Sequence, residues 1–207
     1  MAIHQPKKGE GYRANVDAIW LARFAATKTA RIAFDLGAGS GAVGLELSSL
    51  GGAKHVTFVE IDPEAAAHCE KNVEARGLAA DVLVGDCLNV AETHRGEADL
   101  VVCNPPYVAI GAGRPSPEPR RAKARQGDLA RFVAAARVVL GKRGRAAFVY
   151  PANNLTTLLA TLRDAGLEPK RLQFVHANAN ANARIALVEA KPAKAGGLAI
   201  LPPLFDA

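Results

Sequence analysis

In Arg31-Ile32-Ala33-Phe34-Asp35-Leu36-Gly37-Ala38-Gly39-Ser40-Gly41, a short apolar run passes into a glycine-rich turn, and a helical pattern follows over residues 42–50. Glycines let a backbone turn sharply and approach a ligand closely, and the free N–H groups that open the next helix face whatever polar group binds there. The run therefore predicts a strand, a nucleotide-binding turn and a helix. Gly37, Gly39 and Ala42 also satisfy the loose dinucleotide pattern G-x-G-x-x-G/A, so the turn alone does not separate one nucleotide cofactor from another.

A second strand, predicted over residues 54–60, ends in a carboxylate, Glu60. It lies about 20 residues beyond the glycines, the usual distance for a side chain that accepts hydrogen bonds from ribose hydroxyls. The next residues fit the start of a helix, because Asp62 is a good N-cap and Pro63 suits the first helical position. We therefore interpret Glu60 as the ribose ligand and Asp62 as a helix cap.

Two more predicted strands, residues 81–85 and 98–103, end at Asp86 and Asn104. Asp86 is placed to accept a hydrogen bond from an adenine amino group; the alternative is an aspartate of a turn or N-cap. Ligands of open parallel α/β sheets bind in the crevice at the carboxyl ends of the strands. The polar residues after four predicted strands are therefore expected to converge: Asp35, Gly37, Glu60, Asp86 and Asn104.

The fourth strand leads directly into Asn104-Pro105-Pro106-Tyr107. This turn suits methylation of a planar amino group, whose lone pair is delocalised and must be held where it can reach a methyl donor. The Asn104 side-chain oxygen and the Pro105 carbonyl can accept the two N–H bonds of such an amine, with the prolines fixing the direction of that carbonyl. Tyr107 can stack on the face of the target. The alternative is a strand followed by an ordinary proline turn.

Taken together, these motifs resemble the ordered motifs of class I S-adenosylmethionine-dependent methyltransferases that act on exocyclic or amide nitrogens. Residues 5–22 are similar to the opening of the bacterial tRNA N6-adenine methyltransferases that act at position 37, beside the anticodon, and the resemblance spans most of the chain. It implies S-adenosylmethionine as cofactor, bound by Asp35, Gly37, Gly39, Gly41, Glu60, Ile61, Asp86, Cys87 and Asn104. It also implies a catalytic turn made of Asn104, Pro105, Pro106 and Tyr107.

The rest of the chain predicts ordinary α/β packing. Helical patterns over residues 126–140 and 153–165 are ended by Gly141 and Gly166, and strand patterns cover residues 145–150, 170–176 and 183–190. We expect an α/β fold of the Rossmann-like class I methyltransferase type: a doubly wound, mostly parallel seven-stranded sheet with an antiparallel C-terminal edge hairpin. Residues 1–207 would form one domain, with residues 1–30 covering the cofactor, 31–190 as the core and 191–207 as a tail, extended on the sheet or flexible.

Composition agrees with a small enzyme, since 207 residues with 49% hydrophobic side chains can bury one sizeable core. Cys69, Cys87 and Cys103 form an odd set without CxxC spacing, so neither disulfides nor a metal site is expected. The sequence does not predict a secretion signal, and it contains no apolar stretch of about 18 residues or more. We therefore expect a cytoplasmic protein, a monomer or weak dimer, without membrane partners.

A long Gly- and Pro-rich segment follows Tyr107 and carries five basic residues and one acidic residue within residues 114–125, in a chain of net charge +6. Long loops in compact domains are usually functional or disordered, and a basic one can position RNA through its phosphates. The predicted RNA contacts are Arg114, Arg120, Arg121, Lys123 and Arg125, with a weaker cluster of Lys7, Lys8 and Arg13. The alternative is a solvated charged loop.

The sequence thus predicts an S-adenosylmethionine-dependent enzyme that methylates N6 of an adenine in RNA, with tRNA at position 37 as the expected substrate. A protein glutamine N5-methyltransferase stays open, because a side-chain amide presents a similar planar nitrogen. Two further alternatives come from other classes. An NAD-dependent oxidoreductase is supported only by the glycine turn and Glu60, and a non-catalytic RNA-binding module is disfavoured by the intact Asn104–107 turn.

Overall fold

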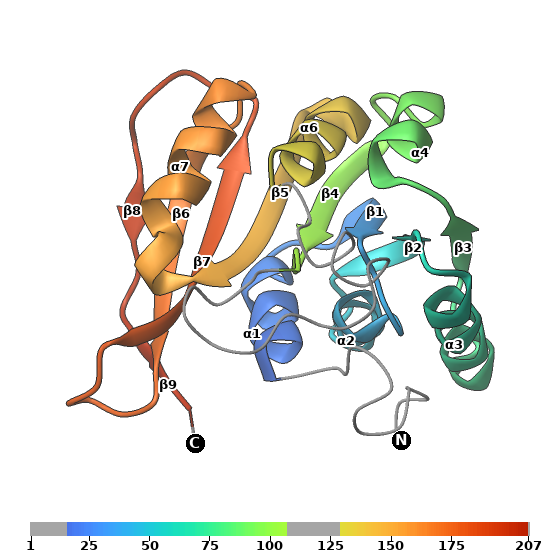
Figure 1. Cartoon of the computed structure of the whole chain (residues 1–207), viewed down its shortest axis with the longest axis horizontal. Coiled ribbons are helices and arrows are strands. Elements are labelled where there is room, and N and C mark those ends of the chain that lie inside the picture. The colour runs from blue at the N-terminus through green and yellow to red at the C-terminus, as the bar shows by residue number, and fades with distance from the viewer. Residues whose placement is uncertain (1–15, 107–128, 207) are drawn as a thin grey trace, which may run out of the picture.

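The computed structural model describes residues 16–106 and 129–206 and consists of one mixed β-sheet with helices on both faces (Figure 1). The long strands are β1 (Ala30–Leu36), β2 (Ala53–Glu60), β3 (Ala80–Val84), β4 (Ala98–Cys103), β5 (Leu140–Pro151), β6 (Glu168–His176) and β7 (Ala183–Lys191). Two short strands close the chain, β8 (Ala199–Ile200) and β9 (Leu204–Phe205). The helices are α1 (Val16–Ala25), α2 (Ala42–Ser49), α3 (Pro63–Arg76), α4 (Cys87–Thr93), α6 (Leu129–Val139) and α7 (Leu155–Asp164), with a 3₁₀ turn at Ala152–Asn154.

The strand order is β3-β2-β1-β4-β5-β7-β6-β8, with β9 also pairing with β6. Strands β1 to β5 are mutually parallel, whereas β7 is antiparallel to both β5 and β6. The order reverses between β1 and β4, and this is the point where open α/β sheets bind ligands, at the carboxyl ends of their strands. The predicted Rossmann-like fold with its C-terminal antiparallel hairpin is confirmed.

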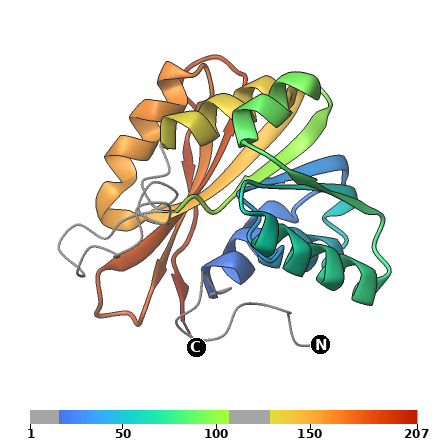
Figure 2. The same ribbon diagram turned by 45° about the vertical axis from the view of Figure 1, so that its right-hand side comes forward.

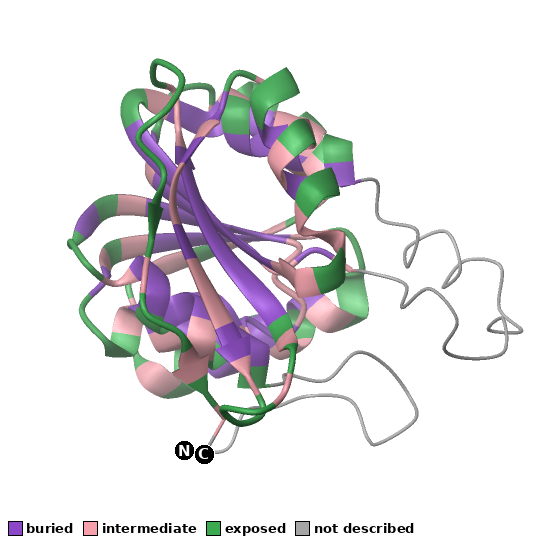
Figure 3. Ribbon diagram, turned by 90° about the vertical axis from the view of Figure 1, so that its left-hand side faces the viewer, coloured by how far each residue is buried: buried purple, intermediate pink, exposed green. Residues whose placement is uncertain are grey.

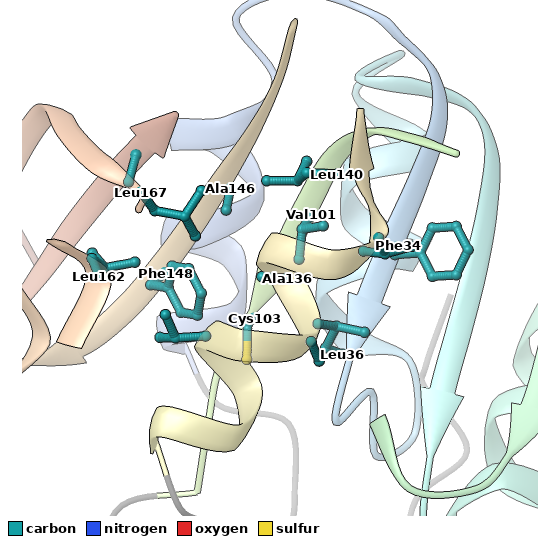
Figure 4. Close-up of a cluster of buried hydrophobic side chains, with 14 of the residues drawn as sticks. Phe34, Leu36, Val101, Cys103, Ala136, Leu140, Ala146, Phe148, Leu162 and Leu167 are labelled. Atoms are coloured by element: carbon teal, nitrogen blue, oxygen red, sulfur yellow. The ribbon is translucent and has the colours of Figure 1, made fainter. Parts of the chain in front are cut away.

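The central strands carry apolar residues at consecutive rather than alternate positions over most of their length, as is typical of a sheet that is buried on both faces. In β4, Leu100 and Val102 pack with α1 and α2 on one face, while Val101 and Cys103 pack with α6 on the other. Figure 2 shows α4, α6 and α7 grouped on one side of the sheet and α2 and α3 on the other. Buried residues fill the middle of this arrangement (Figure 3), and Figure 4 shows the core between β1, β4, β5 and the two helices α6 and α7.

The predicted end of the helix at Gly141 is wrong. Helix α6 ends at Val139, and β5 already begins at Leu140. A Cβ on Gly141 would lie 3.1 Å from the carbonyl oxygen of Gly96, so the glycine serves close approach of two backbones instead of a helix cap. The pairing of β4 with β5 is irregular here, since Ala98 pairs with Leu140 but Leu100 pairs with Arg145.

The seven predicted strands are all present, and the tail adds two short strands, β8 and β9, to the outer side of β6. The tail is therefore extended on the sheet over residues 199–205. Its end is fixed by Asp206, which accepts a hydrogen bond from Trp20 Nε1 at 2.9 Å and pairs with the guanidinium of Arg184 at 3.0 Å. Arg184 also pairs with the buried carboxylate of Asp17. These contacts tie the tail to α1 and to the hairpin.

Candidate active site

The glycine turn between β1 and α2 forms one wall of the candidate site. Gly37, Gly39 and Gly41 have φ angles of 71°, 56° and 87°, which favour glycine over any residue with a side chain. There is also no space for one, because a Cβ on Gly41 would lie 2.7 Å from the sulfur of Cys69 and a Cβ on Gly37 would lie 2.9 Å from the Phe132 ring. The turn therefore presents bare backbone where a ligand approaches.

Helix α3 contacts the glycine turn through a hydrogen bond. The Asn72 side chain, which is 3% exposed, donates a hydrogen bond from Nδ2 to the Ser40 carbonyl at 3.0 Å. Asp62 caps the helix as predicted, with its side chain accepting from the Glu64 N–H at 3.0 Å. Asn72 was not predicted from the sequence, because its partner lies 32 residues away and no local pattern links them.

Asp35 lies beneath the turn rather than on its surface. Its side chain accepts a hydrogen bond from the Gly44 N–H at 2.8 Å and the residue is 1% exposed. Burial raises the pKa of Asp35 to about 7; the bond from Gly44 opposes this rise and the nearby Glu60 carboxylate adds to it. The position indicates that Asp35 braces the first turn of α2, and a direct contact with a cofactor stays a prediction.

Glu60 bridges the ends of two strands. Its Oε2 accepts from the Gly39 N–H at 2.7 Å and its Oε1 accepts from the Asp62 N–H at 2.9 Å. A carboxylate oxygen has two lone pairs, so each oxygen keeps one acceptor position. Two adjacent hydroxyl groups, as on a ribose, match this pair of acceptors. Next to it, Ile61 and Val84 are exposed apolar side chains, at 59% and 53%, and Val84 was missed by the sequence analysis.

Asp86 fills one of the two roles considered for it, the N-cap, and makes a further contact that was not predicted. It is the N-cap of α4, with Oδ1 accepting from the Leu88 and Asn89 N–H groups at 3.0 and 3.2 Å. Arg131 of α6 also donates two hydrogen bonds to the Asp86 carboxylate, from Nε to Oδ2 at 2.7 Å and from Nη2 to Oδ1 at 2.6 Å. The N-cap alternative is thus confirmed, and the adenine contact stays a prediction. The neighbouring Cys87 is 7% exposed and belongs to the core, so a cofactor contact there would come from its backbone.

The strand register brings Asn104 to the same end of the sheet. Leu36 pairs with both Val59 and Cys103. The next residue of each strand, Gly37, Glu60 or Asn104, therefore lies at the same height along the sheet. Asn104 is half-buried after β4 and Pro105 is buried. The expected convergence of the strand ends is therefore found in the structure.

The remaining predicted residues lie outside the described parts of the chain: Tyr107 and the basic residues Lys7, Lys8, Arg13, Arg114, Arg120, Arg121, Lys123 and Arg125. Residues 16–106 and 129–206 contain no cluster of three or more His, Cys, Asp or Glu side chains that could hold a metal ion. In the same ranges no helix is both long enough and apolar enough to span a membrane.

The comparison that decides the family is the match of residues 17–164 to the Methyltransferase small domain. The chain belongs to this methyltransferase family. The methyltransferase is 30% identical over 175 residues to a protein of Shewanella sediminis named "tRNA1(Val) (adenine(37)-N6)-methyltransferase", covering 80% of this chain and 70% of that protein. It is 32% identical over 158 residues to the protein of the same name from Shewanella halifaxensis, covering 73% of this chain and 63% of that one.

Solved structures show the same fold. A predicted O-methyltransferase from Agrobacterium tumefaciens superposes with a TM-score of 0.71 at 22% identity, covering 91% of this methyltransferase and 86% of that chain. A TehB-like SAM-dependent methyltransferase from Corynebacterium glutamicum gives a TM-score of 0.58 at 18% identity, covering 89% and 90%. Family membership excludes the oxidoreductase alternative, for which the glycine turn and Glu60 were the only support.

S-adenosylmethionine is the cofactor of this family, and the described residues fit it. The glycine turn offers bare backbone for close approach, the two oxygens of Glu60 keep one acceptor position each, and Ile61 presents an exposed apolar surface beside them. Asp86 adds an anionic acceptor at the next strand end. The carboxyl ends of the strands thus present backbone donors, carboxylate acceptors and an apolar surface side by side. A nucleoside that carries a charged substituent can bind to such a set of groups.

Proposed function

We propose that this methyltransferase methylates N6 of an adenine in tRNA, at position 37 beside the anticodon. The observation that carries the proposal is the position of Asn104, which starts at the end of β4 level with the glycine turn after β1. In this proposal the Asn104 side-chain oxygen and the Pro105 carbonyl lie beside the glycine turn and face the target amine. The relatives named as tRNA adenine-37 N6-methyltransferases support the choice of substrate. A tRNA substrate would also assign the enzyme to the cytoplasm.

In this proposal the protein acts by holding the amine. The Asn104 side-chain oxygen and the Pro105 carbonyl accept the two amine hydrogens, and this turns the nitrogen lone pair toward the methyl group. Tyr107 holds the base by stacking. When bound, S-adenosylmethionine supplies a methyl group on a positively charged sulfur. The methylated nitrogen then loses its extra proton to solvent, so the site needs no strong general base. An anticodon-loop adenine leaves its stack at lower cost than a base in a duplex.

Labelled methyl transfer tests the substrate class directly. Tritiated donor is supplied with total tRNA or total protein, and the tRNA product is digested to nucleosides. We expect label in N6-methyladenosine and none in protein, and a tRNA with guanine in place of adenine 37 should accept none. Label in a glutamine side chain would instead establish the protein glutamine alternative.

Asn104→Ala tests the orienting role. The methyl-transfer rate should fall by about a hundredfold or more, the scale seen when one transition-state hydrogen-bonding group is lost, while cofactor affinity stays near the wild-type value. Calorimetry with S-adenosylhomocysteine provides the affinity. Turnover at the wild-type rate would reduce the Asn104–107 turn to a structural role.

We further propose that the basic segment after Tyr107 contacts tRNA phosphates. Neutralising Arg120, Arg121, Lys123 and Arg125 should weaken tRNA binding and flatten its salt dependence, because counterion release scales with the number of phosphates neutralised. The matched control neutralises four exposed basic residues at or near the amino ends of β1, β2 and β5, on the opposite edge of the sheet: Lys28, Lys54, Lys142 and Arg143. Equal salt slopes for the two variants in filter binding would mark the segment as merely solvated.

A further inference from the structure

The first turn of α6 is built against the cofactor site at two consecutive residues. Phe132 packs over the glycine turn, close enough that a Cβ on Gly37 would lie 2.9 Å from its ring. Arg131 reaches the next strand ends and pairs with Asp86, 45 residues away in the sequence. The first turn of α6 therefore contacts the expected cofactor position at both ends, at the glycine turn and at Asp86.

The hydrogen bonds on Asp86 are unevenly shared between its two oxygens. Among the described residues, Oδ1 faces three donors, the Leu88 and Asn89 N–H groups and Arg131 Nη2, whereas Oδ2 receives only Arg131 Nε at 2.7 Å. Since a carboxylate oxygen carries two lone pairs, Oδ2 keeps one acceptor position. The side chain is 22% exposed, so this position is still within reach of a ligand.

We propose that Arg131 is a positioning residue for the cofactor. Its guanidinium group holds the Asp86 carboxylate in one orientation, so that the remaining acceptor position of Oδ2 receives the adenine amino group of the cofactor. The inference rests on the proposed adenine contact of Asp86. In this inference Arg131 contacts neither the cofactor's reacting group nor the target base. It acts through the orientation and charge of the carboxylate that it holds.

Arginine suits this role better than lysine. Two parallel N–H···O bonds fix the plane of a carboxylate, whereas an ammonium group is a point charge that leaves the carboxylate free to rotate about it. The Arg131 bond is also the main cause that keeps the pKa of Asp86 below its ordinary value, despite partial burial, with the bonds from Asn89 and Leu88 adding to the effect. Asp86 therefore remains an anion, which is the stronger acceptor for an amino group.

The test compares S-adenosylhomocysteine with its deaminated counterpart, which carries a carbonyl oxygen in place of the adenine amino group. Calorimetry on the full chain gives the ratio of the two affinities. We expect the wild type to prefer the amino ligand by about tenfold or more, the scale of a hydrogen bond to a charged group. Arg131→Met should bring the ratio to about threefold or less, and Arg131→Lys should fall between them. Arg137→Met is the matched control, since Arg137 is an exposed arginine of the same helix.

The ratio separates positioning from mere stabilisation. A purely structural role would weaken both ligands equally, so a wild-type ratio in Arg131→Met overturns the inference. A higher ratio in that variant would also overturn it, because Arg131 would then compete with the amino group for Oδ2. A wild-type protein that binds both ligands equally would refute the Asp86 contact and the inference with it. None of these results depends on RNA, so a failure of the proposed substrate appears only in the methyl-transfer assay.

Discussion

Glu60→Gln is the sharpest test of the cofactor site, because the substitution keeps size and shape and changes only what the side chain can accept. In the wild type both oxygens are committed to a backbone N–H, Oε2 to Gly39 at 2.7 Å and Oε1 to Asp62 at 2.9 Å. A glutamine has one oxygen and one NH₂ group, so one of these two N–H donors must face another donor. The remaining acceptor position on that side, predicted to receive a ribose hydroxyl, disappears as well.

The expected loss is that of one hydrogen bond to a charged group, about 1.5–3 kcal/mol, or about 10- to 150-fold in cofactor affinity. Calorimetry with S-adenosylhomocysteine measures it. Asp62→Ala is the matched control: it removes the N-cap but keeps the backbone N–H that Glu60 accepts from, so it should lower thermal stability and leave affinity within about twofold.

A 2′-deoxy analogue of S-adenosylhomocysteine separates the ribose contact from a collapse of the glycine turn. It should bind the wild type more weakly than the parent compound and should lose less in Glu60→Gln, since the variant already lacks one hydroxyl acceptor. Wild-type affinity of Glu60→Gln for the parent compound would refute the reasoning and leave Glu60 as a brace between Gly39 and Asp62.

Three further predictions concern stability. Burial raises the pKa of Asp35 from 3.8 to about 7, so between these pH values the folded state binds a proton that the unfolded state has lost. The free energy of unfolding should therefore fall as the pH rises from about 4 to about 7, and Asp35→Asn should reduce this pH dependence in thermal melts. Glu189 is 2% exposed and pairs with two arginines, so Glu189→Leu should cost about 3–5 kcal/mol in urea unfolding, and Glu189→Gln less. Gly37→Ala places a side chain at a φ of 71° and against the Phe132 ring, whereas Gly51→Ala places one at a φ of 69° with no atom within 4 Å. Calorimetric melts should show the larger loss of thermal stability for Gly37→Ala. Equal losses would mean that the Phe132 ring moves aside at no cost.

The sequence was most informative where one local pattern determines the structure. The glycine turn, the cap at Asp62 and the carboxylate of Glu60 at a strand end follow from rules that act over a few residues, and each is found as expected. The register then brings the strand ends together, because parallel strands of similar length finish at the same edge of a sheet.

What the sequence did not predict depends on distant partners. Gly141 has the local signature of a helix end, yet it belongs to a strand because two backbones meet there. Arg131 is one of many basic residues, and only the packing of α6 beside α4 shows that it holds Asp86. The tail strands have two residues each and owe their conformation to pairing with β6, since segments this short have no periodicity of their own.

The tail has a further consequence, for how the protein behaves at high concentration. Without it, β6 would be the outermost strand, and an uncovered strand offers its N–H and C=O groups to any second chain. The tail occupies them: the Leu201 N–H donates to the Leu172 carbonyl, and the Asp206 N–H donates to the His176 carbonyl, each at 2.8 Å. We expect that removing the last ten residues would expose the N–H and C=O groups of β6 and promote aggregation at that edge. The tail is therefore expected to help keep the protein dispersed at high concentration.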